Sequence, residues 1–188
     1  VMDLVSGNGF AKRGYPARAL FSIPFVGLNN EGVPLVLNEK GVVSADDFNF
    51  QERTLTDFLQ YEGPTDPRLT GSLGNMFSYR GFRLNVFLTY AFGNVVRLTP
   101  KFRARYNDLN SMTNVFKNRW TKPGEELQTN VPGIISKDQY MANTNIRYGY
   151  NAYNYTNVRI AKGDFIRLKE ISLAYDLPAQ WLQHAVVK

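Results

Sequence analysis

The stretch that decides the fold is YRGFRLNVFLTYAFG, residues 79–93. Between residues 82 and 92 it alternates with a period of two, which predicts a β-strand. The even positions are all apolar or aromatic: Phe82, Leu84, Val86, Leu88, Tyr90 and Phe92. The polar residues Arg83, Asn85 and Thr89 lie at odd positions. We therefore expect one face of this strand to be shielded from water while the other meets a more polar environment.

A tight turn and a second strand precede this one. Arg80-Gly81 predicts a two-residue hairpin turn, because glycine supplies the positive φ that such turns require. The strand expected over about 70–79 would then pair Leu73 with Leu88, which extends the apolar face onto the second strand. Asn75 is the exception on that face.

Alternation predicts two further strands, over about 17–27 and 164–176. The connecting segments 28–69 and 94–163 are long, although each has one stretch compatible with a short helix, near residues 51–61 and 111–120. Loops of that length are unusual in a compact soluble domain. Tight turns at one end and long loops at the other are typical of an antiparallel transmembrane β-barrel. The expected fold is therefore all-β, a partial barrel domain over residues 1–188 with long extracellular loops.

The last of these strands breaks the pattern at its beginning. Ile171, Leu173 and Tyr175 share one face in a regular strand, but Arg167 and Lys169 fall on the same face. A regular strand would therefore carry two charges on its apolar side, which suits lipid only if they lie above the bilayer.

The length of the strand at 82–92 fits a membrane. Ten steps of about 3.4 Å give roughly 34 Å, and a tilt of about 40° projects this to roughly 26 Å. The apolar band of bacterial barrels is about 25 Å tall and is bordered by aromatic residues. We expect the six even positions to face lipid, and Arg83, Asn85 and Thr89 to face the lumen. The inward face of a soluble β-sandwich has the same period, so the pattern alone leaves both environments open.

Composition narrows the chemistry that the chain can perform. The 188 residues include no cysteine, which excludes disulfides. The sequence has one histidine, His184, which is too few for a histidine-based zinc site. No run of eighteen apolar residues is present, so no transmembrane helix is expected. A strand beginning near 184–188 would be cut off by the end of the sequence, and we expect the chain to be a piece of a longer protein.

Positive charge is concentrated in one segment. Residues 94–163 carry 11 Lys/Arg against 4 Asp/Glu, whereas residues 1–93 carry 8 against 9. A basic segment with interleaved tyrosines is compatible with a single-stranded nucleic-acid binder, an alternative that predicts steep salt dependence. The long loop argues against it, and we expect no nucleic-acid partner.

No enzymatic constellation is evident. Glu125-Glu126 is an adjacent pair in a Pro-Gly turn, and neighbouring side chains do not converge on a glycosidic bond. Asp46-Asp47 lacks the spacing of a calcium loop, so calcium in that loop has no support. We expect no catalytic residue, no metal site and no cofactor.

Four stretches, in this order, resemble the SusC/RagA family of TonB-dependent outer-membrane transporters of Bacteroidetes. They are GYPARALFSIPFVGL (14–28), GPTDPRLTGSLGNMFSYRGFRLNVFLTYAFGN (63–94), RWTKPGEELQTNVP (119–132) and AKGDFIRLKEISLAYDLP (161–178). Pro24 departs from the pattern, because a proline inside a strand removes a ladder hydrogen bond. The resemblance covers a late, near-C-terminal portion of the family, without its plug domain, TonB box or most strands.

The resemblance implies part of a nutrient importer in the bacterial outer membrane. Such a protein has a barrel of about 22 strands. It would take up a glycan or peptide, with a SusD-like surface lipoprotein as its lid. TonB–ExbB–ExbD would act through the absent plug region.

The long loop at 94–163 offers the candidate contacts for a solute or the lid. The rings with flat faces suited to a sugar or peptide are Trp120, Tyr148, Tyr150, Tyr153 and Tyr155. The alternative is that these rings pack the loop against itself. A secreted carbohydrate-binding β-sandwich remains the main functional alternative, and it predicts a soluble monomer.

Overall fold

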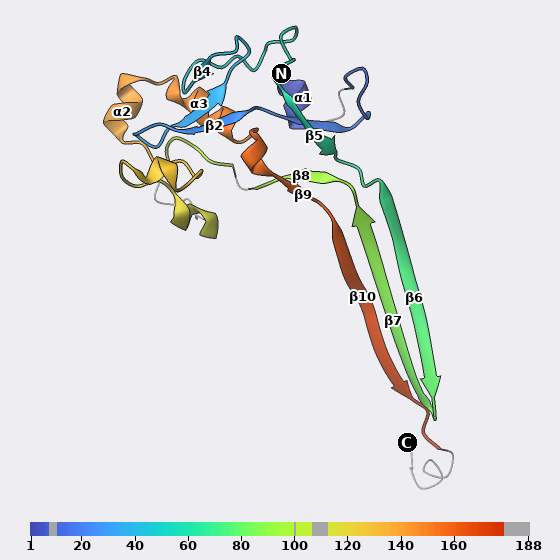
Figure 1. Ribbon diagram of the computed structural model, residues 1–188. Helices are drawn as coiled ribbons and strands as arrows, with labels where there is room; N and C mark the ends of the chain where they lie inside the picture. Colours follow the sequence, from blue (N-terminus) through green and yellow to red (C-terminus); the bar gives the residue numbers. More distant parts are fainter. Residues whose placement is uncertain (8–10, 100, 107–112, 179–188) are drawn as a thin grey trace. The chain divides into compact units, whose positions relative to one another are not determined.

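The computed structural model describes residues 1–7, 11–99, 101–106 and 113–178 (Figure 1). The chain divides into two compact units. Unit 1 comprises Val1–Asp66 and Val95–Lys162, and unit 2 comprises Pro67–Asn94 and Gly163–Lys188. All pairs of named strands are antiparallel, which confirms the all-β fold class expected from the sequence. The described strands form four separate sheets and do not close into a barrel.

Unit 2 is a sheet of three strands in the order β10-β7-β6 (Figure 1). β6 (Leu69–Tyr79), β7 (Phe82–Phe92) and β10 (Phe165–Tyr175) each have 11 residues. The average strand of a globular protein has about 5–6 residues. Strands this long occur where a sheet must cross a bilayer, which takes about 9–11 tilted residues.

The hairpin between β6 and β7 has the predicted turn and the predicted register. Arg80 has φ 45° and Gly81 has φ 87°, so both central residues are left-handed, as a type I′ turn requires. Leu73 pairs with Leu88, and Asn75 pairs with Val86. The sequence pattern and the turn chemistry therefore specify the same hairpin.

Unit 1 holds the shorter elements. Its strand pairs are β1 (Ala19–Ser22) with β5 (Gln60–Pro64), β2 (Phe25–Leu28) with β3 (Pro34–Leu37), β3 with β4 (Val43–Ser44), and β8 (Val95–Arg97) with β9 (Ile160–Lys162). Its α-helices are α1 (Met2–Ser6), α2 (Lys137–Ala142) and α3 (Ile146–Tyr153). Single 3₁₀ turns occur at Asn114–Asn118, Glu125–Leu127 and Asn157–Arg159.

The single strand expected over 17–27 is wrong. The structure forms β1 and β2 there, in two different sheets, with Ile23 and Pro24 between them. Ile23 instead exchanges backbone hydrogen bonds with residues 155 and 157. The physical reason is twofold: Pro24 has no N–H to continue a ladder, and all four residues of β1 are buried, so neither face was free for lipid or lumen.

The two segments expected as long loops are also folded. Residues 28–69 contribute β3, β4 and β5, and residues 94–163 contribute β8, β9 and the helices α2 and α3. The helix expected near 51–61 is absent, because β5 begins at Gln60 and the residues before it form turns. These segments lack long-range periodicity, yet they share a core. The strand expected near 184–188 lies outside the described residues.

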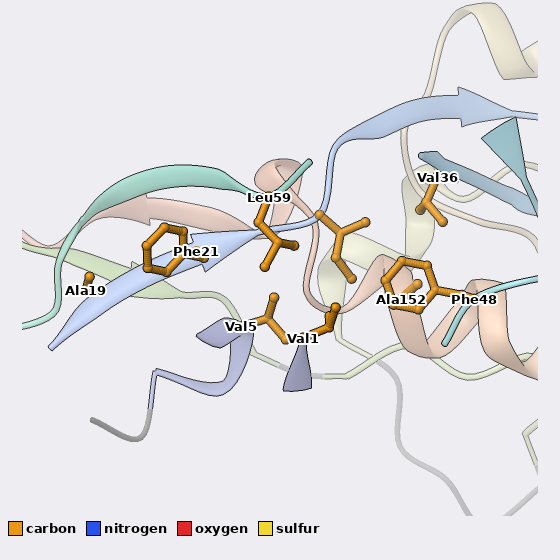
Figure 2. Packing of buried hydrophobic residues seen from close by; sticks show 9 residues of the cluster. Val1, Val5, Ala19, Phe21, Val36, Phe48, Leu59 and Ala152 are labelled. Carbon is orange, nitrogen blue, oxygen red and sulfur yellow. The ribbon is translucent and has the colours of Figure 1, made fainter. Parts of the chain in front are cut away.

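The largest apolar cluster of unit 1 gathers side chains that are far apart in the sequence. Figure 2 shows Val5 of α1 and Val1, the residue before that helix, together with Phe21 of β1 and Ala152 of α3. Its remaining buried members are Ala19, Ile23, Val36, Phe48 and Leu59. Burying such side chains contributes about 1.5–3 kcal/mol for each large one. Unit 1 is therefore a packed domain.

Arg97 is a partly buried arginine that binds several elements of unit 1. The Arg97 guanidinium donates hydrogen bonds of 2.9 Å to the carbonyl oxygens of Val5 and Phe21. Its centre lies 5.2 Å from the centre of the Tyr155 ring. Burial lowers the pKa of Arg97 to about 10, so the side chain stays charged at neutral pH. The cation thus connects α1, β1 and the segment after α3.

Tyr153 gives unit 1 a predictable response to alkaline pH. Burial raises its pKa from 10.0 to about 12, so between these values the unfolded chain loses a proton that the folded chain retains. Stability should therefore fall as the pH rises from about 10 to 12, by about 2 kcal/mol for this group. We expect Tyr153→Phe to remove one high-pKa step from the ultraviolet titration of tyrosine and to flatten the loss of stability. The free energy of unfolding of each protein at pH 8 serves as its reference. If the variant lost stability between about pH 10 and 12 as steeply as the unsubstituted protein, the prediction would be contradicted.

Candidate functional site

One face of the sheet in unit 2 is apolar across all three strands. We call it the apolar face and define it by the even positions of β7 and the residues paired with them. β7 contributes the six residues expected from the sequence, Phe82, Leu84, Val86, Leu88, Tyr90 and Phe92. β6 contributes Leu69, Gly71, Leu73, Asn75, Phe77 and Tyr79. β10 contributes Ile166, Leu168, Ile171, Leu173 and Tyr175.

A β-bulge in β10 changes the expected placement of Arg167. Leu168 pairs with Leu88 and Glu170 pairs with Phe87, so Lys169 is an extra residue without a partner on β7. The bulge reverses the alternation, and Arg167 therefore lies on the opposite face, paired with Thr89. The expectation that Arg167 shares the face of Ile171 is therefore wrong, whereas the pairing assigns Lys169 to neither face. No residue of the apolar face, as defined above, is charged.

Aromatic side chains border the apolar face at both ends. Near the hairpin turn, the Phe82 and Tyr175 rings are 4.4 Å apart between centroids. At the other end, Tyr90 and Phe92 stack at 5.6 Å. Between them the face is aliphatic except for Asn75 and Phe77. Gly71 leaves room for the Tyr90 ring, with which a Cβ at that position would clash.

The apolar face is open to solvent. On the two outer strands, its large apolar side chains are exposed by 39% at Tyr175 up to 70% at Tyr79. An uncovered apolar surface on this scale marks a site where protein or lipid binds. Within the described part of unit 2, neither a second sheet nor a helix covers these side chains.

The other face of the same sheet carries the polar network. Arg83 forms a 2.6 Å ion pair with Asp176, and the Asn85 amide donates a 3.0 Å hydrogen bond to Glu170. Thr89 lies on this face too, paired with Ser72 on β6. The structure thus places the three residues expected toward a lumen on one face. That the face borders a lumen stays a prediction.

Trp120 is held by its own loop. Its indole N–H donates a 3.0 Å hydrogen bond to Glu126, and this bond contributes most to lowering the pKa of that carboxyl. Its ring lies against Gly32 and Gly133, where a Cβ on Gly32 would clash with it. The ring is partly buried, so a solute contact by Trp120 stays a prediction.

Two of the four candidate tyrosines are buried. Tyr150 is 1% exposed and donates a 2.6 Å hydrogen bond to the carbonyl oxygen of Gly133. Tyr153 is 2% exposed and packs against Phe102, with centroids 5.4 Å apart. Both rings are almost completely buried in this structure. For these two residues the alternative of loop packing describes what is observed.

The other two tyrosines are partly exposed. The Tyr148 hydroxyl accepts a 3.2 Å hydrogen bond from Arg147, whose guanidinium lies 5.0 Å from the ring centre. The Tyr155 hydroxyl accepts a 3.3 Å hydrogen bond from Lys101. Contact of these rings with a solute or a lid stays a prediction.

Neither a metal centre nor a membrane helix is found in the part of the chain that the structure describes. Three or more His, Cys, Asp or Glu side chains are nowhere grouped there. Asp47 instead pairs with Lys40 at 2.9 Å, and Asp46 accepts a hydrogen bond from Asn143. Of the described helices, none has both the length and the apolar character needed to cross a bilayer.

Sequence reasoning missed two features of these surfaces. The bulge at Lys169 had one signal, the pair of basic residues that interrupts an otherwise apolar alternation. The second is a group of three arginines around a cavity in unit 1, described below. Its signal was the alternation of Phe102, Arg103, Ala104 and Arg105, which lies in a segment without regular secondary structure.

The fold and surface define an all-β protein in which a sheet of 11-residue strands, apolar on one open face, is joined to a compact unit of short elements. A similar fold occurs in the solved structure titled "Structure of the RagAB peptide transporter", with a TM-score of 0.56 and 21% identity over 92% of this chain and 18% of that one. The structure of the RagAB peptide importer in its "closed-closed" state has a TM-score of 0.55 and 21% identity over 93% of this chain and 18% of that one. The structure of the importer in its "open-open" state has a TM-score of 0.53 and 18% identity over 93% of this chain and 17% of that one.

These likenesses show the fold. The chain spans less than a fifth of the length of the solved chains it matches. No family model matches the sequence, and a search of curated proteins found no match.

Proposed function

We propose that this chain is a wall segment of a β-barrel transporter in the bacterial outer membrane. In this proposal β6, β7 and β10 cross the bilayer with the apolar face against lipid, and the polar face borders the lumen. The barrel would be completed by strands that belong to other parts of the protein, up to about 22 in total. The role is structural and transport-related, without catalysis.

The apolar face is the observation that carries the proposal. Its strands have the length of transmembrane strands, its ends are aromatic, its middle is mainly aliphatic, and none of its paired residues is charged. The bulge also supports the proposal, because it places Arg167 on the polar face, away from lipid. Lipid would bury this surface without a second protein layer.

The connectivity supports the same assignment. β6 begins, β7 ends and β10 begins at the end of the sheet remote from the Arg80-Gly81 turn. All three of these strand ends lead into unit 1 within a few residues. A two-residue turn at one end and large connections at the other are typical of outer-membrane barrels, whose large loops are extracellular.

A peptide or a glycan is the proposed cargo, with a SusD-like surface lipoprotein as the partner of unit 1 and TonB–ExbB–ExbD as the energy source through a plug domain. The similarly folded solved chains are titled as a RagAB peptide transporter and importer, which favours a peptide. The secreted carbohydrate-binding sandwich is less well supported, because it needs a second sheet over the apolar face.

Thiol labelling of the full-length protein in isolated outer membranes tests the orientation of β7. The segment 1–188 contains no cysteine, so single cysteines can be introduced in turn without background from it. We expect Asn85→Cys to react with a water-soluble thiol reagent and Leu84→Cys and Val86→Cys to be protected. A lipid-soluble reagent should give the reverse order.

The control is Met76→Cys, on the same face as Asn85 but on the neighbouring strand. It should follow Asn85. Equal labelling of Val86→Cys and Asn85→Cys by the water-soluble reagent would refute a lipid-facing surface.

A further inference from the structure

Unit 1 contains an open cavity of about 460 Å³ with an excess of positive charge. Arg103, Arg105 and Arg147 line it, together with Tyr106, Tyr140 and Asn151. Ala104 and the buried ring of Tyr150 complete the lining. None of these lining residues is acidic. Cavities of roughly 300–1,000 Å³ are the usual size for small-molecule sites.

Local structure brings the three arginines to the cavity. Phe102 and Ala104 are buried while Arg103 and Arg105 are exposed, so this irregular segment turns both arginines outward. Arg147 and Asn151 are four residues apart on α3 and therefore lie on one side of the helix. The two sides of the cavity thus come from segments more than forty positions apart in the sequence.

Asn154 fixes these two segments against each other. Its buried amide donates 2.8 Å and 3.0 Å hydrogen bonds to the carbonyl oxygens of Phe102 and Tyr150. Its side-chain oxygen accepts a 2.6 Å hydrogen bond from the backbone N–H of Phe102. Because a buried amide with three partners has one arrangement, the spacing of the arginines is built into the core.

The charges of the three arginines are not neutralised within the described part of unit 1. None of the three forms an ion pair among the described residues. The Arg105 guanidinium lies 5.5 Å from the Tyr140 ring centre, and Arg147 lies against Tyr148. These contacts orient the guanidinium groups while leaving their charge free. Clustering like charges around a cavity costs stability, which an anionic ligand would offset.

We propose that this cavity binds a solute that carries at least two carboxylates. Guanidinium groups match carboxylates through paired N–H donors, and tyrosine hydroxyls and Asn151 can hydrogen-bond the rest of the ligand. An acidic peptide and a sugar acid share this chemistry. Binding depends on unit 1 alone, and only the identification of the solute as cargo rests on the proposed function.

Calorimetric titration of the purified full-length protein in detergent, at low salt, tests the site. The probes are N-acetyl-triglutamate and trigalacturonate, each compared with a neutral counterpart, N-acetyl-triglutamine amide or trigalactose. We expect one acidic probe to bind and its neutral counterpart to bind at least about tenfold more weakly, with affinity falling as salt is added. The acidic probe that binds identifies the source of the carboxylates.

Variants assign the binding to these residues. Arg105→Gln and Arg147→Gln should each weaken binding about fivefold, and the double variant about twentyfold. Arg53→Gln, an exposed arginine remote in sequence, should leave binding unchanged. Arg147→Lys keeps the charge but lacks the paired N–H donors, so it should bind more tightly than Arg147→Gln and more weakly than the unsubstituted protein, which separates charge from folding.

Equal binding of acidic and neutral probes, or unchanged binding by the double variant, would overturn the site. The thiol-labelling pattern of β7 is measured on the same protein. If β7 is labelled as expected but no acidic probe binds, only this inference fails. If an acidic probe binds but the labelling of β7 differs from the expected pattern, only the membrane assignment fails.

Discussion

Val86→Arg is expected to prevent stable assembly of the full-length protein in the outer membrane. Val86 lies at the middle of β7, between Leu84 and Leu88 on the apolar face. An arginine facing the bilayer midplane of a β-barrel destabilises it by about 2–4 kcal/mol. We expect little of the variant in the heat-modifiable, folded form in membranes, and a lower urea midpoint for what does fold in detergent.

Asn85→Arg is the matched control. It introduces the same side chain one residue away, on the face that already holds Arg83 and Arg167. We expect assembly within about 1 kcal/mol of the unsubstituted protein, since this face is polar. If both substitutions were equally tolerated, the apolar face would not contact hydrocarbon. If both were equally harmful, strand packing would account for the loss.

Deleting Leu168 is expected to have an effect of similar size. The extra residue at Lys169 allows Ile166 and Leu168 to share a face with Ile171. Without Leu168, a regular strand would place Lys169 on the apolar face. A strand that kept the bulge would instead place Arg167 there. Either arrangement puts a charge toward lipid, at a cost of about 2–4 kcal/mol near the midplane, measured by the same folding assays.

Deleting Lys169 provides the control for chain length. The remaining residues would alternate regularly, with Leu168 and Ile171 still on the apolar face and Glu170 still opposite. We therefore expect this deletion to be tolerated, although it removes a charged residue from the same place. A harmful Lys169 deletion together with a harmless Leu168 deletion would show that the observed register is wrong.

How far the sequence could predict these surfaces differs between the units. In unit 2, the even positions of β7, the hairpin turn and the pairing of Leu73 with Leu88 follow from side-chain alternation and turn chemistry, which are local properties. The bulge in β10 could not be predicted, because a bulge forms only against a partner strand with a fixed register.

In unit 1 the sequence identified chemically suitable rings but could not determine their burial. Tyr150 and Tyr153 lie on α3 together with Tyr148, within six residues of one another, yet two are buried and one is partly exposed. That difference depends on what packs against each side of the helix. The same holds for Arg103 and Arg147, which are separated by 44 positions and meet at one cavity.

By itself the sequence determined an antiparallel hairpin of long strands with one apolar side, because period-two alternation and a left-handed turn act over neighbouring residues. The tertiary structure alone decided that 17–27 breaks into two sheets, that 28–69 and 94–163 fold into a packed unit, and that Arg167 leaves the apolar face. Each of these features depends on contacts between segments that are distant in the chain. The free energy of such contacts cannot be predicted from a local sequence pattern.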